Sequence, residues 1–152
     1  MKSCLVVPDQ DQGSMGKGCK FSTNVSADKV VGVLTGTWSP NKVENGFSVL
    51  LSEGGCNNWL DCQPHSLFNP CVFINHHCTT PNVRFEKVLI DGFHFLLVVT
   101  SKACEAQEWV SVNYDSKKAY FESEECACSS CSSGSGTSTI MDSIEAHGPF
   151  HI

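Results

Sequence analysis

The chain has 152 residues, a length that predicts one domain with a core large enough to fold without disulfide bonds. Hydrophobic residues make up 41% of it and charged residues 17%, which excludes wholesale disorder. The formal net charge of −6 disfavours direct nucleic-acid binding, because phosphate recognition needs clustered lysine and arginine; a lysine-rich peptide suits an acidic chain better.

Ten cysteines are the unusual feature of the composition. Their even number fits a secreted disulfide protein, which is one interpretation. However, the apolar run Leu5–Val7 is too short for a signal-peptide core, and three cysteines crowd into residues 126–131. We therefore expect an intracellular chain with reduced thiols, in the nucleus or the cytoplasm. The longest apolar run, Phe93–Val99, is far below membrane-spanning length, so no membrane association is expected.

Short segments rich in valine, isoleucine, phenylalanine and threonine predict a mainly β fold. The predicted strands, in chain order, are Val30–Thr37, Phe47–Ser52, Cys71–Asn75, Val83–Ile90, Phe93–Thr100 and Trp109–Tyr114. Asp91-Gly92 predicts a two-residue hairpin turn. Val83, Phe85 and Leu89 would share one face of an alternating strand, and the nearly continuous apolar strand after the turn would be buried on both faces. Ser101–Trp109 is the best candidate for a short helix.

Near the C-terminal end, Cys126, Cys128 and Cys131 form a C-x-C-x2-C run that could supply three thiolates to a zinc ion. Thiolates this close repel one another unless a cation neutralises them, and a fourth ligand would have to come from elsewhere in the chain. The alternative is a cysteine-rich terminus that binds no metal. The overlapping Ser/Gly/Thr-rich stretch Ser129–Thr139 is typical of a flexible segment.

Three further segments carry polar clusters. The turn Gly16-Lys17-Gly18 lets backbone amides approach a ligand, but without a preceding buried strand it is not a dinucleotide fingerprint. Phe73–Asn82 runs from an apolar strand into Asn-His-His-Cys-Thr-Thr-Pro-Asn, which indicates either a site at a strand end or a capped strand with an Asn/Pro turn. Ala106–Asp115 includes Tyr114, which by itself is an ordinary residue at the rim of a sheet.

Taken in this order, these segments resemble the SET-domain family of protein lysine methyltransferases. The glycine turn is similar to the opening G-x-G of that family. Asn75–Asn82 is similar to its N-H-S-C-x-P-N signature, and Ala106–Tyr114 to its G-E-E-L-T-x-D-Y strand. The C-x-C-x2-C run falls where the zinc-binding post-SET motif follows. The resemblance covers roughly residues 15–132, most of the chain.

The resemblance implies a fold of small β-sheets with a pseudoknot and a zinc-bound post-SET segment. It divides the chain into an N-terminal segment 1–14, a SET domain 15–118, a post-SET zinc-binding segment 119–132 and a flexible tail 133–152. It also implies S-adenosylmethionine-dependent methyl transfer to a lysine of a protein or peptide, with a histone tail as one candidate. The implied roles are cofactor binding for Gly16, Lys17, Gly18, Asn75 and His76, catalysis for Tyr114, and zinc binding for Cys78, Cys126, Cys128 and Cys131.

The N-H and G-E-E-L segments depart from the family pattern. His77 stands where a serine is usual, two residues instead of one separate Cys78 from Pro81, and Gln107 replaces a glycine. No tyrosine precedes Tyr114, although family members place one in the lysine channel.

Aromatic residues upstream of the N-H segment could line that channel instead; they are Trp38, Phe47 and Trp59. The departures leave two further interpretations open. One is a degenerate SET protein that binds cofactor or peptide and zinc without turnover, as an interaction module. The other is a zinc-bound structural module in which Asn75 and Tyr114 have no chemical role.

Overall fold

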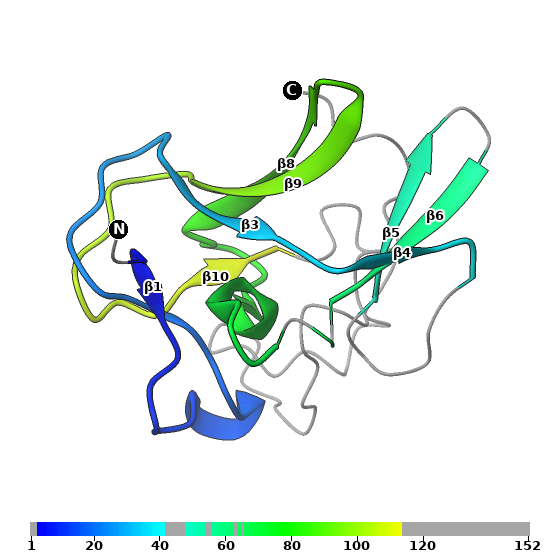
Figure 1. Ribbon diagram of the computed structural model, residues 1–152. Helices are drawn as coiled ribbons and strands as arrows, with labels where there is room; N and C mark the ends of the chain where they lie inside the picture. The colour runs from blue at the N-terminus through cyan, green and yellow to red at the C-terminus, as the bar shows by residue number, and fades with distance from the viewer. Residues whose placement is uncertain (1–2, 42–47, 54–55, 63, 65, 114–152) are drawn as a thin grey trace.

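The computed structural model describes residues 3–41, 48–53, 56–62, 64 and 66–113, with the side chains of residues 48–58 left out (Figure 1). Its strands form three sheets. The strands β1 (Leu5–Val6) and β2 (Lys20–Phe21) make a two-stranded sheet. The order β4-β6-β5 makes a three-stranded sheet, from Thr37–Ser39, Cys56–Asp61 and Ser48–Glu53.

A five-stranded sheet forms the main body of the described chain, in the order β3-β9-β8-β10-β7. Its strands are β3 (Val30–Leu34), β7 (Asn75–His76), β8 (Val83–Ile90), β9 (Phe93–Thr100) and β10 (Ser111–Val112). Short 3-10 helices at Gly13–Met15 (η1) and Pro70–Phe73 (η3) connect the strands. The prediction of a mainly β fold is confirmed.

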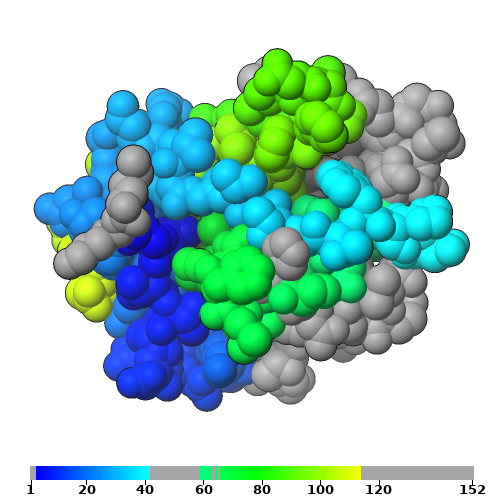
Figure 2. Space-filling view, in the orientation of Figure 1, coloured from blue at the N-terminus to red at the C-terminus, as the bar shows by residue number. Residues whose placement is uncertain are grey.

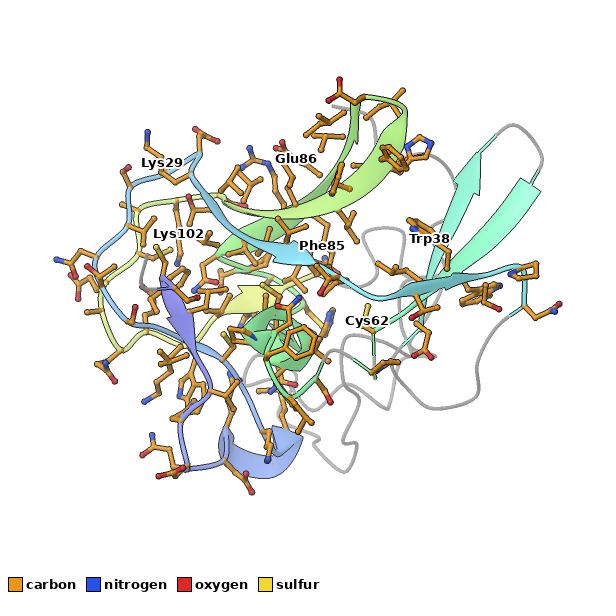
Figure 3. All side chains as sticks on the ribbon, in the orientation of Figure 1. Lys29, Trp38, Cys62, Phe85, Glu86 and Lys102 are labelled. Carbon is orange, nitrogen blue, oxygen red and sulfur yellow. The ribbon has the colours of Figure 1, made fainter. Side chains whose placement is uncertain are left out.

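The β8–β9 hairpin has the bounds that the sequence predicts. Asp91 and Gly92 both have positive φ, of 50° and 84°, as a two-residue type I′ turn requires. Phe85 and Glu86 lie on opposite faces of the ribbon, and Phe85 is buried (Figure 3). The face that Val83, Phe85 and Leu89 share is buried at its beginning and exposed at its far end, where Leu89 is 63% exposed.

The prediction that the second strand of the hairpin is buried on both faces is wrong. β3 pairs with β9 only between Leu96 and Val99, and burial is concentrated in the same half of β9. The other half projects from the surface, where Phe93 is 70% exposed (Figure 2).

Two predicted elements differ in the structure. Residues 70–73 form η3 instead of a strand, because Pro70 begins the turn and the Asn69 side chain accepts a hydrogen bond of 3.0 Å from the Cys71 amide. Ser101–Trp109 is not a helix. Its middle pairs through Cys104 with Val25, and Gln107 has φ of 71°, outside the helical region.

The predicted strand Val30–Thr37 is divided into β3 and β4 at Gly36. A side chain at Gly36 would collide with the backbone carbonyl of Asp61, so the chain can pass this point only without a Cβ atom. The predicted strand Phe47–Ser52 corresponds to β5, and the first of its residues lies outside the described residues.

Cysteines contribute to one contiguous core. Cys19, Cys62, Cys71 and Cys104 are buried as free thiols and pack as small apolar residues. Burial raises the pKa of Cys62 and of Cys71 to about 12. Figure 3 shows Cys62 beside the three-stranded sheet, and this residue and Leu60 belong to the shared core. No helix among the described residues is long and apolar enough to cross a membrane.

The strand β10 is the strand around which the candidate functional site, described below, is built. It lies between β7 and β8 and runs parallel to both, with Ser111 opposite Asn75 and Val112 opposite His76 and Val83. A segment near the end of the described chain is thereby inserted beside the segment Asn75–Asn82, which is called the N-H segment below. The residues that would complete a pseudoknot follow Asn113 and lie outside the described residues.

Candidate functional site

Asn75 is the centre of the site and is fully buried. Its side-chain Nδ2 donates two hydrogen bonds, one of 2.9 Å to the carbonyl of Lys17 and one of 3.0 Å to Oε1 of Gln12. Its Oδ1 is buried and has no hydrogen-bond partner among the described residues. A buried acceptor without a partner is costly, so this atom requires a donor that the described chain does not supply.

The two glycines of the G-x-G turn are required by its geometry. Gly16 has φ of 72° and ψ of −144°, a region that is essentially restricted to glycine. A Cβ atom on Gly18 would lie 2.5 Å from Oε1 of Gln12 and 2.8 Å from the Trp109 ring. The turn therefore brings bare backbone against Asn75, and the carbonyl of Lys17 joins the two segments.

Two lysines of this region lie over aromatic rings. Nζ of Lys20 is 4.5 Å from the centroid of the Trp109 ring, and Nζ of Lys17 is 5.8 Å from that of Phe73. Both distances are within the range of cation–π attraction. The Lys20 contact also links β2 to the segment before β10, with which Lys20 forms an isolated bridge at Trp109.

His76 and Cys78 lie on one side of the N-H segment. Nε2 of His76, a buried residue, is 3.1 Å from Sγ of Cys78, which is half-buried. Within the described residues, no group of three or more His, Cys, Asp or Glu side chains could hold a metal ion. The other predicted zinc ligands are Cys126, Cys128 and Cys131, and they lie outside the described residues.

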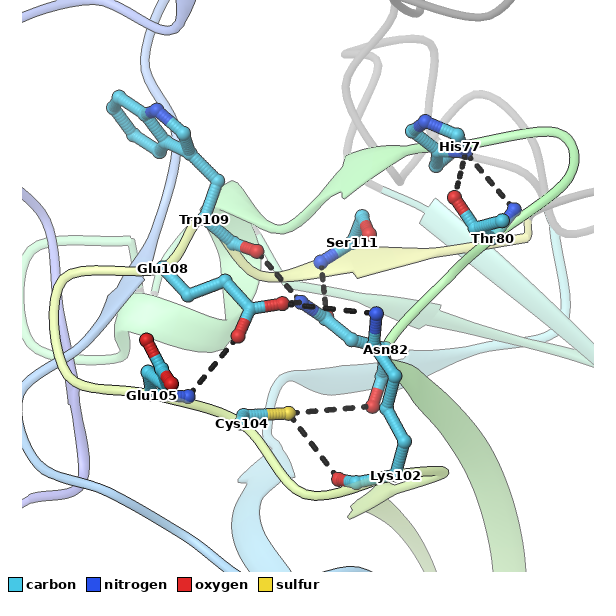
Figure 4. Close-up of polar contacts among 9 residues, drawn as sticks. All are labelled: His77, Thr80, Asn82, Lys102, Cys104, Glu105, Glu108, Trp109 and Ser111. Atoms are coloured by element: carbon cyan, nitrogen blue, oxygen red, sulfur yellow. Dashed lines mark hydrogen bonds and ion pairs between the residues drawn. The ribbon is translucent and has the colours of Figure 1, made fainter.

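His77 shows why this chain can depart from the usual N-H-S pattern. Its Nδ1 accepts a hydrogen bond of 3.1 Å from the Thr80 amide (Figure 4). It also accepts a longer one of 3.4 Å from the Thr79 amide. The ring therefore caps the turn after Cys78, which has one residue more than the family motif. The two departures are adjacent, and the imidazole of His77 stabilises the longer turn.

Asn82 connects the N-H segment to β10 and its preceding turn (Figure 4). Its Nδ2 donates to the carbonyl of Trp109 at 2.8 Å and to Oε1 of Glu108 at 3.1 Å, while its Oδ1 accepts from the Ser111 amide at 2.8 Å. Both hydrogens of the amide nitrogen and the oxygen of this buried side chain are therefore hydrogen-bonded. The sequence marks Asn82 as part of a motif, but its role depends on residues 26 to 29 positions away.

The same turn is closed by Glu108. Its Oε2 accepts a hydrogen bond of 3.0 Å from the Glu105 amide, and its Oε1 lies 3.8 Å from Nζ of Lys102. Glu108 and Asn82 together fix where β10 begins. The sequence alone predicts this structural role for neither residue.

The described chain ends at Asn113, immediately before the predicted catalytic Tyr114. The His77 amide donates to the carbonyl of Val112 at 3.0 Å, and Nδ2 of Asn113 donates to the carbonyl of Cys78 at 3.3 Å. These contacts attach the residues preceding Tyr114 to the N-H segment. Trp38 and Trp59, two of the proposed channel residues, lie on β4 and β6, whereas Phe47 and Tyr114 are outside the described residues.

Comparison with solved structures gives the class of the fold. The chain has the SET-domain fold: it superposes on CpSET8 from Cryptosporidium with a TM-score of 0.62 at 17% sequence identity, covering 74% of this chain and 57% of CpSET8. A scan against protein-family models finds no match, and neither does a search of curated proteins.

Two further similar structures come from the Polycomb Repressive Complex 2 of Chaetomium thermophilum bound to GSK126. One has a TM-score of 0.60 at 18% identity and covers 75% of this chain but 16% of the other. A humanized mutant of that complex, bound to the inhibitor GSK126, has a TM-score of 0.62 at 19% identity and covers 75% and 15%. This chain thus spans a little over half the length of CpSET8 and about a sixth of the complex chains.

Proposed function

We propose that this protein is an S-adenosylmethionine-dependent protein lysine methyltransferase. The observation that carries the proposal is the arrangement around Asn75, in which the G-x-G turn, the N-H strand β7 and the inserted strand β10 meet. The SET-domain fold supports it, since the same three segments carry the family resemblance in the sequence.

The residues around Asn75 fit such a cofactor. Its buried Oδ1 requires a donor, and the ammonium of the methionine part of S-adenosylmethionine is one. Gly18 leaves no room for a side chain beside Gln12 and Trp109, and Gly16, Lys17 and His76 complete the set of residues expected to hold the cofactor. When bound, S-adenosylmethionine supplies an electrophilic methyl group on a positively charged sulfur.

The target lysine must be neutral to act as a nucleophile. With an ordinary pKa near 10.4, about 0.1% of a free lysine is neutral at pH 7.4, which corresponds to about 4 kcal/mol. A positive charge nearby lowers that pKa, and alignment of the amine contributes several kcal/mol more. We assign the hydroxyl of Tyr114 and nearby main-chain carbonyls the task of orienting the amine. The substrate is a protein or peptide, and a histone tail suits the acidic chain.

The proposal includes one structural zinc ion, held by Cys78, Cys126, Cys128 and Cys131. What supports it is the position of Cys78 at the N-H segment and the spacing of the three later cysteines. The segment boundaries 15–118 and 119–132, and the nucleus or cytoplasm as location, belong to the same proposal. Elemental analysis should find one zinc per chain, and a metal-free protein with full activity would contradict this assignment.

The variant Tyr114→Phe tests the chemical step. It removes one hydroxyl and keeps the ring, so cofactor affinity should persist while single-turnover methyl transfer falls about 10²–10³-fold, the usual effect of losing one preorganised donor. Asn75→Ala should do the reverse and weaken calorimetric binding of the cofactor. If Tyr114→Phe transfers methyl groups like the native protein, the catalytic assignment is wrong.

A second candidate function is favoured by the absence of any tyrosine before Tyr114. In that case the protein binds cofactor or peptide without turnover and acts as an interaction module. Cofactor binding in calorimetry, together with no methyl transfer to any lysine peptide, would support this alternative.

A further inference from the structure

We infer that Gln12 is a positioning residue of the cofactor site: it accepts the second hydrogen of the Asn75 amide nitrogen and so holds in place the orientation that the Lys17 carbonyl requires. The inference rests on the proposed function and adds a residue that lies outside the resembling segments. Gln12 precedes η1, and its side chain is 63 positions from its partner in the sequence.

The orientation of the Asn75 amide follows from its donors and acceptors. A carboxamide nitrogen carries two hydrogens, and its oxygen can only accept. The carbonyl of Lys17 can only accept as well, so the atom 2.9 Å from it must be Nδ2 of Asn75. The second hydrogen of Nδ2 is directed at Oε1 of Gln12, 3.0 Å away. With both hydrogens used, Oδ1 is left as the buried acceptor without a partner in the described chain.

Gln12 is itself held in place by the turn that follows it. Its amide donates to the carbonyl of Gly16 at 2.7 Å, and its own carbonyl accepts from the Met15 amide at 3.0 Å. Its Oε1 also occupies the space beside Gly18 where a Cβ atom would otherwise lie. Gln12 therefore belongs to the same hydrogen-bonded turn as the two glycines, with its side chain against Gly18.

This arrangement has a consequence for ligand choice. Without the Oε1 acceptor, one hydrogen of Nδ2 loses its partner, and the amide of Asn75 is fixed only by the carbonyl of Lys17. A ligand that donates a hydrogen bond to Oδ1 should therefore bind with lower affinity after this change. The affinity of a ligand without such a donor should stay the same.

The test compares two adenosine thioethers by isothermal titration calorimetry. S-adenosylhomocysteine carries the amino-acid ammonium, whereas 5′-methylthioadenosine lacks it. In Gln12→Leu we expect the affinity for S-adenosylhomocysteine to fall about tenfold, the effect of one buried hydrogen bond, and the affinity for 5′-methylthioadenosine to change less than about twofold. The matched control Gln12→Glu keeps an acceptor oxygen and should bind both within about threefold of the native protein.

If Gln12→Leu fails to fold, Gln12→Asn replaces it, because an amide shortened by one methylene cannot reach Asn75. An equal loss of affinity for both ligands, or no loss of affinity for either, would overturn the inference and give Gln12 a role in the turn alone. Failure of the native protein to bind S-adenosylhomocysteine would overturn the proposed function as well, so the two failures are distinguishable.

Discussion

Replacing Asn82 should destabilise the whole domain, because this side chain connects β10 to the start of β8. Asn82→Leu keeps the approximate shape and removes all three side-chain hydrogen bonds, to Glu108, Trp109 and the Ser111 amide. Each contributes about 1 kcal/mol net, and the Ser111 amide, left buried without its partner, adds about 1–3 kcal/mol. The expected loss in the free energy of unfolding is about 4–6 kcal/mol.

Urea denaturation of native and variant protein measures this loss directly. The matched control is Asn24→Leu, since Asn24 is an exposed asparagine whose Oδ1 accepts one hydrogen bond of 2.8 Å from the Ala106 amide. The control should lose about 1 kcal/mol or less. A loss below about 1 kcal/mol for Asn82→Leu would refute the reasoning, because the buried network would then contribute no more than one exposed hydrogen bond.

A double substitution tests the donor and acceptor assignment. Asn82→Asp places a carboxylate against the Glu108 carboxylate and should destabilise strongly at pH 7. Adding Glu108→Gln restores a donor toward position 82, and the new amide oxygen still accepts from the Glu105 amide. We expect the pair to be more stable than Asn82→Asp alone. Additive losses would show that the two side chains do not interact.

Three further predictions concern strain and protonation. Gln107→Gly should raise the free energy of unfolding by as much as about 1 kcal/mol, because φ is 71° at this position and glycine adopts that value without strain. Ala106→Gly should lower the free energy of unfolding by about 0.5–1 kcal/mol, and urea denaturation compares the two variants. Cys62 and Cys71 stay protonated in the folded chain until about pH 12, whereas the same thiols ionise at lower pH in the unfolded chain. The free energy of unfolding should therefore fall above pH 9, by up to about 1.4 kcal/mol per pH unit for each thiol. A denaturation midpoint unchanged from pH 8 to 10.5 would contradict this. Methyl transfer should rise nearly tenfold per unit between pH 7 and 8.5, as the neutral fraction of the substrate lysine grows; a flat profile with rate-limiting chemistry would instead mean that the protein lowers that pKa strongly.

Local sequence signals predicted the parts of the fold that local chemistry determines. The hairpin has its predicted bounds because Asp91-Gly92 can adopt positive φ at both positions and the flanking residues favour strands. By contrast, η3 depends on a cap from Asn69, which also donates to the Val33 carbonyl 36 positions away. The turn at 101–109 depends on pairing with Val25 and Phe21. Apolar composition alone cannot report such contacts.

The candidate site also has features that the sequence predicts and features that depend on contacts between distant parts of the chain. The resemblance assigns the G-x-G turn and the N-H segment to one cofactor site, which stays a prediction; the structure joins the two segments through the hydrogen bond from Asn75 to the Lys17 carbonyl. It could not predict Gln12, which belongs to no motif and reaches Asn75 only through the fold. Nor could it predict that His77 caps the longer turn, since that requires the positions of the Thr79 and Thr80 amides.

The most direct test of the central claim is transfer of a labelled methyl group from S-adenosylmethionine to an array of lysine-containing peptides that includes histone tails. We predict label on lysine side chains of a defined subset of peptides with the native protein, and loss of that label with Tyr114→Phe. No label on any peptide, from a protein that binds S-adenosylhomocysteine in calorimetry, would contradict the claim of catalysis and leave a binding module with the SET-domain fold.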